Sequence, residues 1–481
     1  MTDASPDTAP APAPAAEAPA PAADRRRAAS PFAALRPGRA DALAAGLILA
    51  AFALIRVAAY GSGLRVDPAV VQGLWQNLTL AELDADLVGA LLDLHAQPPL
   101  WNLVLGLFVK ACGPDPLCVS EGLLALHMAL TPAIALLIWA TLRLAGASRP
   151  LAWGAAALFA LSPGPLFYET FALYAQLCCA LAAGGAFALA AFARGARGGA
   201  EAALMLSAVL CLTWPLFHPA WMLVTLAALL LVDARRVLRP RPLAVFALAT
   251  ALALAPSAWN FHRHGLFSNG SWMGVNLSQT VSWLSPEQAD RCLFAGVIED
   301  IEQAHAAGRL PGPPAVRDKS VHDPAIIPRS RECLGVATAE IRAHPGDWLA
   351  GRAGALVASH RLWSWEYPNY APLGWAELPI PDTSRSDPPW AEGAEGWGLL
   401  ALFALTAGGM LGLVACGLMG RRRGLALALL MQIAAFTAAS HIANGEEQNR
   451  MRHAIAPEWL MVAALGADAL RRRRRAARPP A

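Results

Sequence analysis

Long apolar runs separated by arginine-rich turns are the feature that most constrains the fold of this chain. Runs of about 20 residues, the length that a helix needs to cross a bilayer, recur along the sequence. Charged residues make up 15% of the 481 residues, whereas a soluble domain carries about 25%. We therefore predict an all-α polytopic membrane protein.

The apolar runs predict the spans, and the arginines predict their orientation. We expect single spans at 41–60, 120–143, 150–166, 171–192, 242–261, about 396–419, 424–442 and 454–470, and two short helices that meet at a proline-containing turn within 203–232. Arginines mark the turns between spans and both ends of the chain, so the positive-inside rule puts both termini in the cytoplasm.

Two termini in the cytoplasm require an even number of membrane crossings. About ten spans are clear, and the short run 100–112 would add an eleventh. Either this run enters without crossing, or one arginine-marked turn lies outside.

Polarity divides the chain into five parts. These are an Ala/Pro-rich cytoplasmic tail (1–39, with the first 30 residues expected to be disordered), a membrane module (40–261) with a first outer loop (61–97), an outer, periplasmic segment (262–395), C-terminal membrane helices (396–470) and a basic tail (471–481). Leucines at helical spacing predict amphipathic helices in the first outer loop, and residues 334–362 resemble one helix. Tryptophans 363, 365, 375, 390 and 397 suit a membrane-interface belt.

The eight cysteines show no spacing typical of a metal site. Four lie in apolar runs, where we expect small core residues: Cys178, Cys179, Cys211 and Cys416. Cys292 and Cys333 share the outer segment. They would pair in an oxidising compartment, and the sequence leaves the paired and unpaired states open.

Residues 93–102 read Asp-Leu-His-Ala-Gln-Pro-Pro-Leu-Trp-Asn, a polar loop followed by an apolar helix. Proline suits the first turn of a helix and disfavours helix just before it, so Pro98-Pro99 marks where the loop ends. Three other polar groups fall on the predicted outer face: Tyr168-Glu169 with Tyr174 and Gln176, His218 with Asn260–His264, and 441–453. They indicate one site at the bilayer interface, or simply outer loops that meet water.

Several short motifs together carry a resemblance to a known family. They are an aspartate (Asp67) soon after the first span, Pro98-Pro99-Leu100 opening a helix, Ser162-Pro163 with Tyr168-Glu169 before a span, Asn260-Phe-His-Arg-His-Gly-Leu-Phe with Asn269 and Asn276, and Glu446-x-x-x-Arg450-x-Arg452-His453 with Pro457 before the last span. Their order over residues 40–470 resembles the GT-C superfamily of membrane glycosyltransferases, in its bacterial branch of ArnT-like and protein-mannosyltransferase-like enzymes.

This resemblance implies a GT-C-like bundle of about 10–11 spans and an inverting sugar transfer from a polyprenyl-phosphate donor. An aspartate in the first outer loop would take the proton of the acceptor hydroxyl. Asp67 matches the position of the family's acid, although Asp67-Pro68 replaces the usual Asp-Glu pair. Asp67 also suits a helix cap with Pro68 at the first helical position. Asp86 is the second candidate, and Asp84 and Asp93 are further rivals.

The candidate substrate-binding residues come from all four polar groups: His95, Gln97, Tyr168, Glu169, His218, Arg450, Arg452 and His453. Arg450 and Arg452 are the expected phosphate ligands, because arginine binds phosphate bidentately and keeps its charge near a bilayer. Equally, they would suit ion pairs with Glu446 and Glu447 or with lipid headgroups. His95 suits the donor phosphate, the acceptor or a plain interfacial position.

We expect no cofactor besides the lipid-linked sugar, which serves as co-substrate, and the need for a divalent metal stays open because Asp84-Ala85-Asp86 is a weak pair. The expected partners are membrane lipid and the polyprenyl-phosphate-linked donor, with no nucleic acid. The expected location is the bacterial inner membrane.

A transporter or flippase of lipid-linked intermediates is the main alternative function, and a non-catalytic membrane scaffold is a third possible function. Transporters usually place ionisable residues near the bilayer midplane; here the charges lie at span ends, which favours the enzyme.

Overall fold

The computed structural model describes residues 30–310, 322–358, 423–443 and 448–477, with isolated helical positions between 409 and 418. Several sequence predictions fall on residues outside these ranges. They are the disordered N-terminal tail, most of the span at 396–419, the five tryptophans between 363 and 397, Cys416, and the carboxylates Glu446 and Glu447.

All regular structure in the described ranges is helical. In chain order the helices are η1 (Ala33–Leu35), α1 (Arg39–Gly61), α2 (Pro68–Gly73), α3 (Leu80–Ala85), α4 (Leu87–Asp93), α5 (Pro99–Cys112), α6 (Pro116–Leu144), α7 (Arg149–Leu161), α8 (Pro163–Glu169), α9 (Ala175–Ala193), α10 (Gly199–Thr213), α11 (Trp221–Val237), α12 (Pro240–His264), α13 (Met273–Ser278), α14 (Pro286–Cys292), α15 (Phe294–Ala306), α16 (Ile326–Ala343), α17 (Pro345–Ala358), α19 (Arg423–Ala443), α20 (Gln448–Ala454) and α21 (Ala456–Ala476).

Five of these helices are long and apolar enough to cross a membrane: α1, α6, α9, α12 and α19. Helices α7 and α8 form a sixth candidate if they count as one broken span, because they are bent by 47° at Ser162. Pro163 explains the break, since a proline cannot continue the helix that precedes it. The chain is therefore an all-α polytopic membrane protein, as the apolar runs predict.

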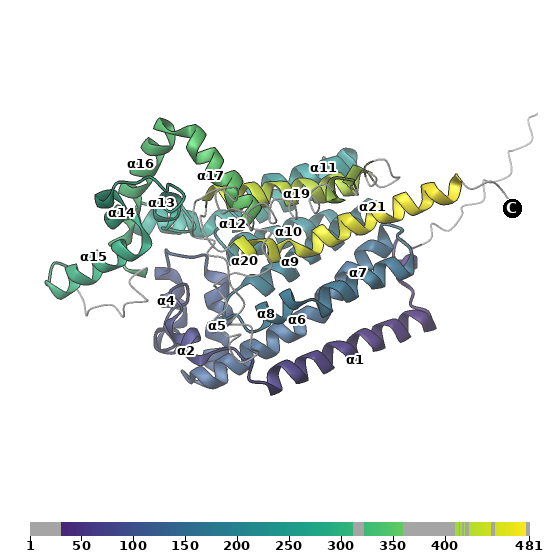
Figure 1. The fold of residues 1–481 in the computed structure, drawn as a ribbon, viewed down its shortest axis with the longest axis horizontal. Helices are drawn as coiled ribbons and strands as arrows, with labels where there is room; N and C mark the ends of the chain where they lie inside the picture. Colours follow the sequence, from purple (N-terminus) through teal and green to yellow (C-terminus); the bar gives the residue numbers. More distant parts are fainter. Residues whose placement is uncertain are drawn as a thin grey trace, which may run out of the picture.

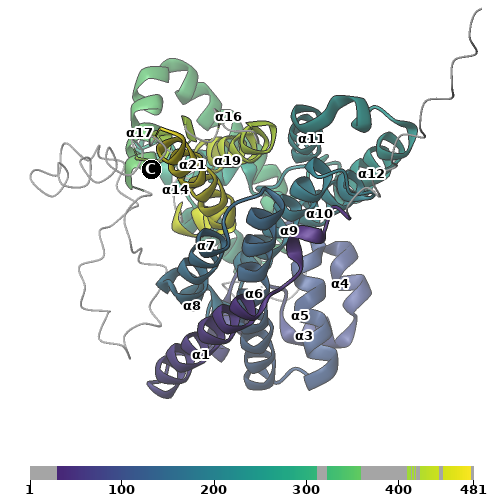
Figure 2. The ribbon, with the colours of Figure 1, turned by 90° about the vertical axis from the view of Figure 1, so that its right-hand side faces the viewer.

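The long helices run side by side along the longest axis of the molecule (Figure 1). Helix α9 lies inside the bundle and packs against α6, α10 and α21 (Figure 2). Most of its side chains are buried. Helices α1 and α12 bury few of their residues and present apolar side chains outward, as lipid-facing helices do.

The arginine-marked turns meet at one end of the bundle, which we call the basic end. Arg149 at the start of α7 lies 3.4 Å from Asp41 in the first turn of α1. Arg236 of α11 donates to the Ala196 carbonyl, in the turn after α9, at 3.1 Å. Arg472 of α21 donates to the carbonyl of Gly146 between α6 and α7. The first residues of α1 and the last of α21 thus share one end, as the even-crossing prediction requires.

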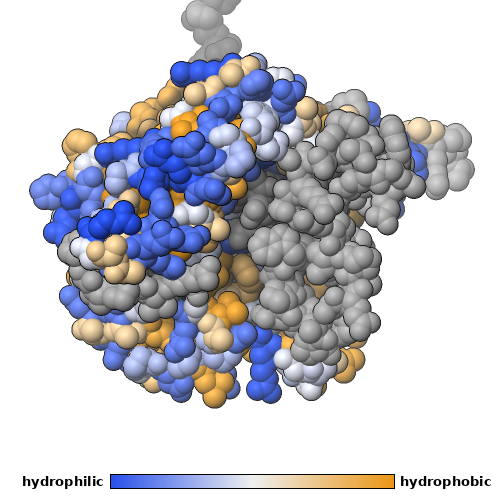
Figure 3. Space-filling model, turned by 60° about the vertical axis from the view of Figure 1, so that its left-hand side comes forward, coloured by the Kyte–Doolittle hydropathy of each residue, from blue (hydrophilic) through white to orange (hydrophobic). Residues whose placement is uncertain are grey.

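The opposite end, which we call the loop end, holds α2–α5 and α13–α16 (Figure 1). Hydrophilic side chains gather over the upper part of this face (Figure 3). Disulfides Cys112–Cys118 and Cys292–Cys333 span Cα–Cα distances of 5.8 and 5.2 Å. The second joins α14 to α16, so the pairing that the sequence left open is present.

Helix α5 does not cross the bundle. It has 14 residues, which rise only about 21 Å, whereas the hydrocarbon core is about 30 Å thick. Lys110 near its end donates to the Asp84 carbonyl of α3. Cys112 at its end is bonded to Cys118 at the start of α6, and α6 runs from there to the basic end. The first of the two alternatives for residues 100–112 therefore holds.

Two predicted boundaries differ from the structure. The single helix expected over 334–362 is two helices, because Pro345 ends α16 and opens α17. The basic tail predicted from residue 471 begins inside α21, which continues to Ala476. By contrast, Cys178, Cys179 and Cys211 are buried core residues, as predicted.

Candidate functional site

A cavity of about 860 Å³ lies at the loop end, between the membrane helices and the outer segment. Its lining comes from the first outer loop, α9, the turn after α10, the stretch 268–295, α19 and α20: Trp75, Gln76, Ala96, Gln97, Tyr174, Trp214, Pro215, Leu216, His218, Ser268, Asn269, Gly270, Trp272, Met273, Asn276, Gln279, Val281, Ser282, Leu284, Ala289, Leu293, Phe294, Ala295, Ala439, Ile442, Arg450 and Met451. The lining includes five aromatic rings of Trp, Tyr and Phe and five side-chain amides among apolar aliphatic side chains.

The start of α5 holds one wall of the cavity in place. Trp101 is 1% exposed and donates from Nε1 to Asn77 Oδ1 at 2.9 Å. Asn102 Oδ1 accepts the Leu78 amide at 2.8 Å. These buried contacts fix the turn that presents Trp75 and Gln76 to the cavity.

His95 holds the facing loop, residues 268–272. Its carbonyl accepts the amide of Ser271 at 3.0 Å, and its Nδ1 lies 3.0 Å from Ser271 Oγ. Its Nε2 lies 3.0 Å from the carbonyl of His322. These contacts bring Asn269 and Trp272 to the cavity, while the His95 ring itself stays behind the lining.

Burial holds His95 in its neutral form. The side chain is 1% exposed, and the ring of His264 lies 5.0 Å away in an edge-to-face contact. Burial first, and the charge of His264 second, lower the pKa of His95 from 6.5 to about 4. At neutral pH the ring is therefore uncharged and joins the two loops through hydrogen bonds.

Three aromatic rings line one part of the cavity. The ring centroids of Trp75 and Trp272 are 5.0 Å apart, and Phe294 lies 5.4 Å from Trp75 and 5.2 Å from Trp272. They come from the first outer loop and from the outer segment. Such a cluster offers flat apolar faces to a ligand.

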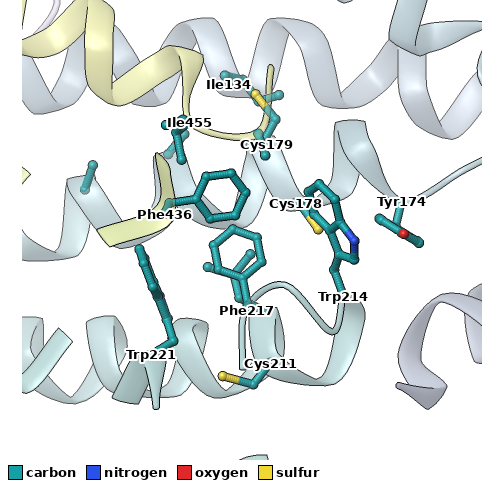
Figure 4. Packing of buried hydrophobic residues seen from close by; sticks show 14 of the residues in the cluster. Ile134, Tyr174, Cys178, Cys179, Cys211, Trp214, Phe217, Trp221, Phe436 and Ile455 are labelled. Atoms are coloured by element: carbon teal, nitrogen blue, oxygen red, sulfur yellow. The ribbon is translucent and has the colours of Figure 1, made fainter. Parts of the chain in front are cut away.

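Among the described lining residues, Arg450 is the one Lys or Arg, and it is 2% exposed. Its Nη1 donates to Gln76 Oε1 at 3.2 Å, and its guanidinium lies 5.6 Å from the ring of Tyr174 and 5.4 Å from that of Trp214. Two aromatic faces stabilise a desolvated guanidinium through cation–π attraction. Phe217 and Phe436 stack at 4.6 Å, and both rings contact the ring of Trp214 (Figure 4).

A buried polar network holds α20, the short helix that carries Arg450. His453 Nε2 lies 2.7 Å from Gln176 Oε1, and Gln176 Nε2 donates to Thr131 Oγ1 at 2.8 Å. The ring of Tyr168 stacks on His453 at 4.0 Å. Packing and hydrogen bonds from α6, α8 and α9 thereby orient α20.

The same network ends in a buried ion pair between Glu169 and Arg56. Arg56 donates from Nε and Nη2 to the two Glu169 oxygens at 3.0 and 2.8 Å. Tyr60 donates to Glu169 at 2.6 Å and Thr131 at 2.5 Å. The carboxylate of Glu169, fully buried, therefore has four donors. We did not select Arg56 from the sequence; its signal was an arginine inside an otherwise apolar span.

The structure brings three of the predicted site residues together at the cavity: Gln97, His218 and Arg450. Tyr168, Glu169 and His453 belong to the buried network behind α20. His95 lies behind the lining. Arg452, on the same short helix as Arg450, is partly buried and is not among the lining residues.

The candidate bases, Asp67 and Asp86, are N-caps. Asp67 accepts the amide of Ala69 at 2.8 Å and begins α2, with Pro68 at the first helical position. Asp86 accepts the amide of Gly89 at 2.9 Å and begins α4. Neither lines the cavity, and none of the described lining residues carries a carboxylate.

The two further candidate bases, Asp84 and Asp93, each lie beside a cationic side chain. The Asp84 carboxylate lies 4.0 Å from Lys110 Nζ, and Asp93 pairs with Arg263 on the surface. In the described ranges, no three His, Cys, Asp or Glu side chains gather as metal ligands would.

The sequence did not single out Trp214, Asn269 and Trp272 as site residues, although all three line the cavity. Tryptophans and amides are common in loops at a membrane interface, so composition gave no reason to select these. Searches against family models, curated proteins and solved structures find no match for this chain.

Proposed function

We propose that this chain is an inverting membrane glycosyltransferase of the bacterial inner membrane. In this proposal it transfers a sugar from a polyprenyl-phosphate donor to a lipid, glycan or protein acceptor on the outer face, as the GT-C resemblance implies. One observation carries the proposal: Arg450 is buried in an aromatic and amide-lined cavity at the loop end of a membrane bundle.

Arg450 suits the leaving phosphate of such a donor. A guanidinium makes charge-assisted hydrogen bonds to phosphate oxygens, and these are stronger than neutral hydrogen bonds. A cation held in a water-poor cavity stabilises charge as it develops on the departing group. A cavity at the end of the spans lets the isoprenoid chain remain in the bilayer while the sugar phosphate enters.

The transfer itself needs a base for the acceptor hydroxyl. As the base takes the proton, the hydroxyl oxygen bonds to the sugar C1, and the C1–O bond breaks with its electron pair leaving on the phosphate. Asp67 stays the first candidate and Asp86 the second. Because neither lines the cavity, the proposal requires the part of the first outer loop that carries Asp67 or Asp86 to approach the bound substrates during the reaction.

A transfer assay with the purified protein in detergent tests this function. The donors are polyprenyl-phosphate-linked hexoses and pentoses, and the readout is sugar transferred to membrane lipid, glycan and protein acceptors. We expect Arg450→Gln to lower kcat by about 10²–10³, the usual cost of removing one group that stabilises developing charge.

Arg452→Gln is the matched control, because Arg452 lies two positions further on the same helix and is not among the lining residues. Its transfer rate should stay within about twofold of wild type, as for substitutions away from a site. Equal losses in both variants would contradict the role given to Arg450.

Transport of lipid-linked intermediates is the competing function, and the buried Arg56–Glu169 pair is the observation that favours it. Ionisable residues inside membrane helices often mark a transport path. Here, however, four donors hold the Glu169 carboxylate. Transfer by the detergent-purified protein, where there is no membrane to cross, supports the enzyme. Lipid flipping in vesicles without any transfer supports the transporter.

A further inference from the structure

Three buried polar atoms at the cavity have no hydrogen-bond partner among the described residues: Gln97 Oε1, Asn269 Nδ2 and Trp272 Nε1. Their side chains are 7%, 2% and 3% exposed. Buried polar groups normally have partners, and one left without a partner destabilises the fold. Three such atoms on one cavity indicate that a ligand supplies the missing hydrogen bonds.

The three side chains come from two loops that lie against each other. The amide of Ser271 donates to the carbonyl of His95 at 3.0 Å. A Cβ added at Gly270 would lie 3.3 Å from the Ala96 carbonyl, so the missing side chain permits the close approach. Gln97 on one loop and Asn269 with Trp272 on the other therefore belong to one rigid corner of the cavity.

The unpaired atoms point to a ligand with several hydroxyl groups. Gln97 Oε1 is an acceptor without a donor, and Asn269 Nδ2 is a donor without an acceptor, among the described residues. Trp272 Nε1 offers a donor only. A hydroxyl both donates and accepts, and the partly exposed rings of Trp75 and Phe294, which line the same cavity, offer apolar surface to a sugar ring.

The charged side chains of the cavity lining favour a sugar ring that carries no charge. None of the described lining residues is a carboxylate that would pair with an amino sugar. The cation, Arg450, is held by Tyr174 and Trp214, outside the aromatic cluster of Trp75, Trp272 and Phe294. An acidic sugar would compete with the donor phosphate for that cation. A neutral sugar would not compete with the phosphate for Arg450.

We propose that Gln97, Asn269 and Trp272 form a subsite that recognises the hydroxyl groups of a neutral sugar. The identification of this sugar as the transferred group rests on the proposed glycosyltransferase function. Recognition of the sugar itself does not, and it is measured by binding alone.

The binding experiment uses the full chain in detergent and measures the thermal unfolding midpoint and tryptophan fluorescence. The probes are methyl glycosides of neutral hexoses and pentoses, compared with glucosamine and glucuronate at the same millimolar concentrations. The subsite predicts stabilisation and a fluorescence change with at least one neutral glycoside, and weaker effects with both charged sugars.

The variants Gln97→Leu and Asn269→Leu give a signature that a structural role would not produce. Each removes an unpaired amide and keeps most of its volume, so the unfolding midpoint without sugar should stay at the wild-type value or rise. Sugar affinity should fall about tenfold for each, the usual effect of one lost hydrogen bond. Trp272→Phe keeps a six-membered aromatic ring, removes the Nε1 donor together with the five-membered ring, and should also weaken binding.

Gln288→Leu is the matched control, because its amide is hydrogen-bonded and is not among the lining residues of the cavity. Gln288 caps α14 and donates to Glu340 at 3.1 Å. This variant should lower the unfolding midpoint and leave sugar affinity unchanged, the reverse of the cavity variants.

Two results would overturn the subsite: unchanged affinity in Gln97→Leu, Asn269→Leu and Trp272→Phe, or tighter binding of glucosamine or glucuronate than of every neutral glycoside. The transfer assay separates this inference from the proposed function. Neutral-sugar binding that depends on Gln97, without any sugar transfer, supports the subsite and contradicts the glycosyltransferase function. Transfer only from donors with an amino or acidic sugar supports the glycosyltransferase function and contradicts the neutral-sugar subsite.

Discussion

His95 links the stability of one wall of the cavity to pH. Because its folded pKa is about 4 against an ordinary 6.5, the unfolded chain binds a proton between these pH values that the folded chain does not. The stability that the neutral ring contributes is complete above pH 6.5 and is lost as pH falls toward 4. A shift of this size corresponds to a loss on the order of 3 kcal/mol.

We therefore expect His95→Gln to flatten the fall in the thermal unfolding midpoint between pH 6.5 and 4. A glutamine amide can replace the bonds to Ser271 and His322 but does not titrate. His262→Gln changes an exposed histidine at the end of α12 and serves as the control. An unchanged pH profile in His95→Gln would show that other groups govern acid sensitivity.

Asp67 combines a proposed catalytic role with an observed structural one, and one pair of substitutions separates the two. Asparagine caps a helix as well as aspartate does but is not a base, whereas alanine removes both properties. Asp67→Asn should therefore keep the wild-type unfolding midpoint and lose most transfer activity. Asp67→Ala should lose activity and also about 1 kcal/mol of stability.

The same comparison at Asp86 decides between the two candidate bases, because Asp86 caps α4 in the same way. Full transfer activity in both asparagine variants would exclude the first outer loop as the source of the base.

At the scale of elements, the Arg56–Glu169 pair ties α1 to α8 and so supports the network behind α20. Breaking a buried ion pair leaves one charge without compensation, which usually costs 3–5 kcal/mol, while replacing both partners by apolar residues costs much less. Glu169→Leu alone should therefore lower the free energy of unfolding by about 3–5 kcal/mol.

The double variant Arg56→Met with Glu169→Leu should recover a large part of that loss, as measured by unfolding in detergent. A double variant as unstable as Glu169→Leu would mean that Tyr60 and Thr131, which also donate to Glu169, dominate the stability of this region.

At the scale of the whole molecule, the position of α5 decides the topology. Because α5 begins and ends at the loop end, the start of α6 lies on the same side as the outer segment. A membrane-impermeant maleimide added to intact cells should label Glu121→Cys, an exposed position near the start of α6. Arg197→Cys, exposed at the basic end after α9, should be labelled only after permeabilisation. Reversed labelling would contradict the assigned orientation.

The span arrangement was predictable because its signals are local. Apolar run length and flanking arginines are properties of one segment, and they predicted α1, α6, α9, α12 and α19 with errors of a few residues. Helix α7 ends at Leu161, two residues before Pro163, and not at the expected residue 166. A proline disrupts a helix within one turn, whereas the length of an apolar run is judged over about twenty residues.

The site was only partly predictable, because its residues meet through contacts that no local pattern encodes. Gln97, His218 and Arg450 stood out as polar residues at span ends, and they do line the cavity. Arg56 and Glu169 are 113 residues apart. Neither the partner of Glu169 nor the placement of Trp272 beside Trp75 follows from the spacing of residues along the chain.

The contact between His95 and Ser271 has a consequence for how the protein is made. These residues are 176 positions apart, and a ribosome adds about 5–20 residues per second. The first outer loop therefore emerges roughly 9 to 35 s before the loop at Ser271 that packs against it. Throughout that interval Trp75 and Gln76 have no facing wall. A nascent chain that stops before residue 271 carries most of its spans but only half of its binding site.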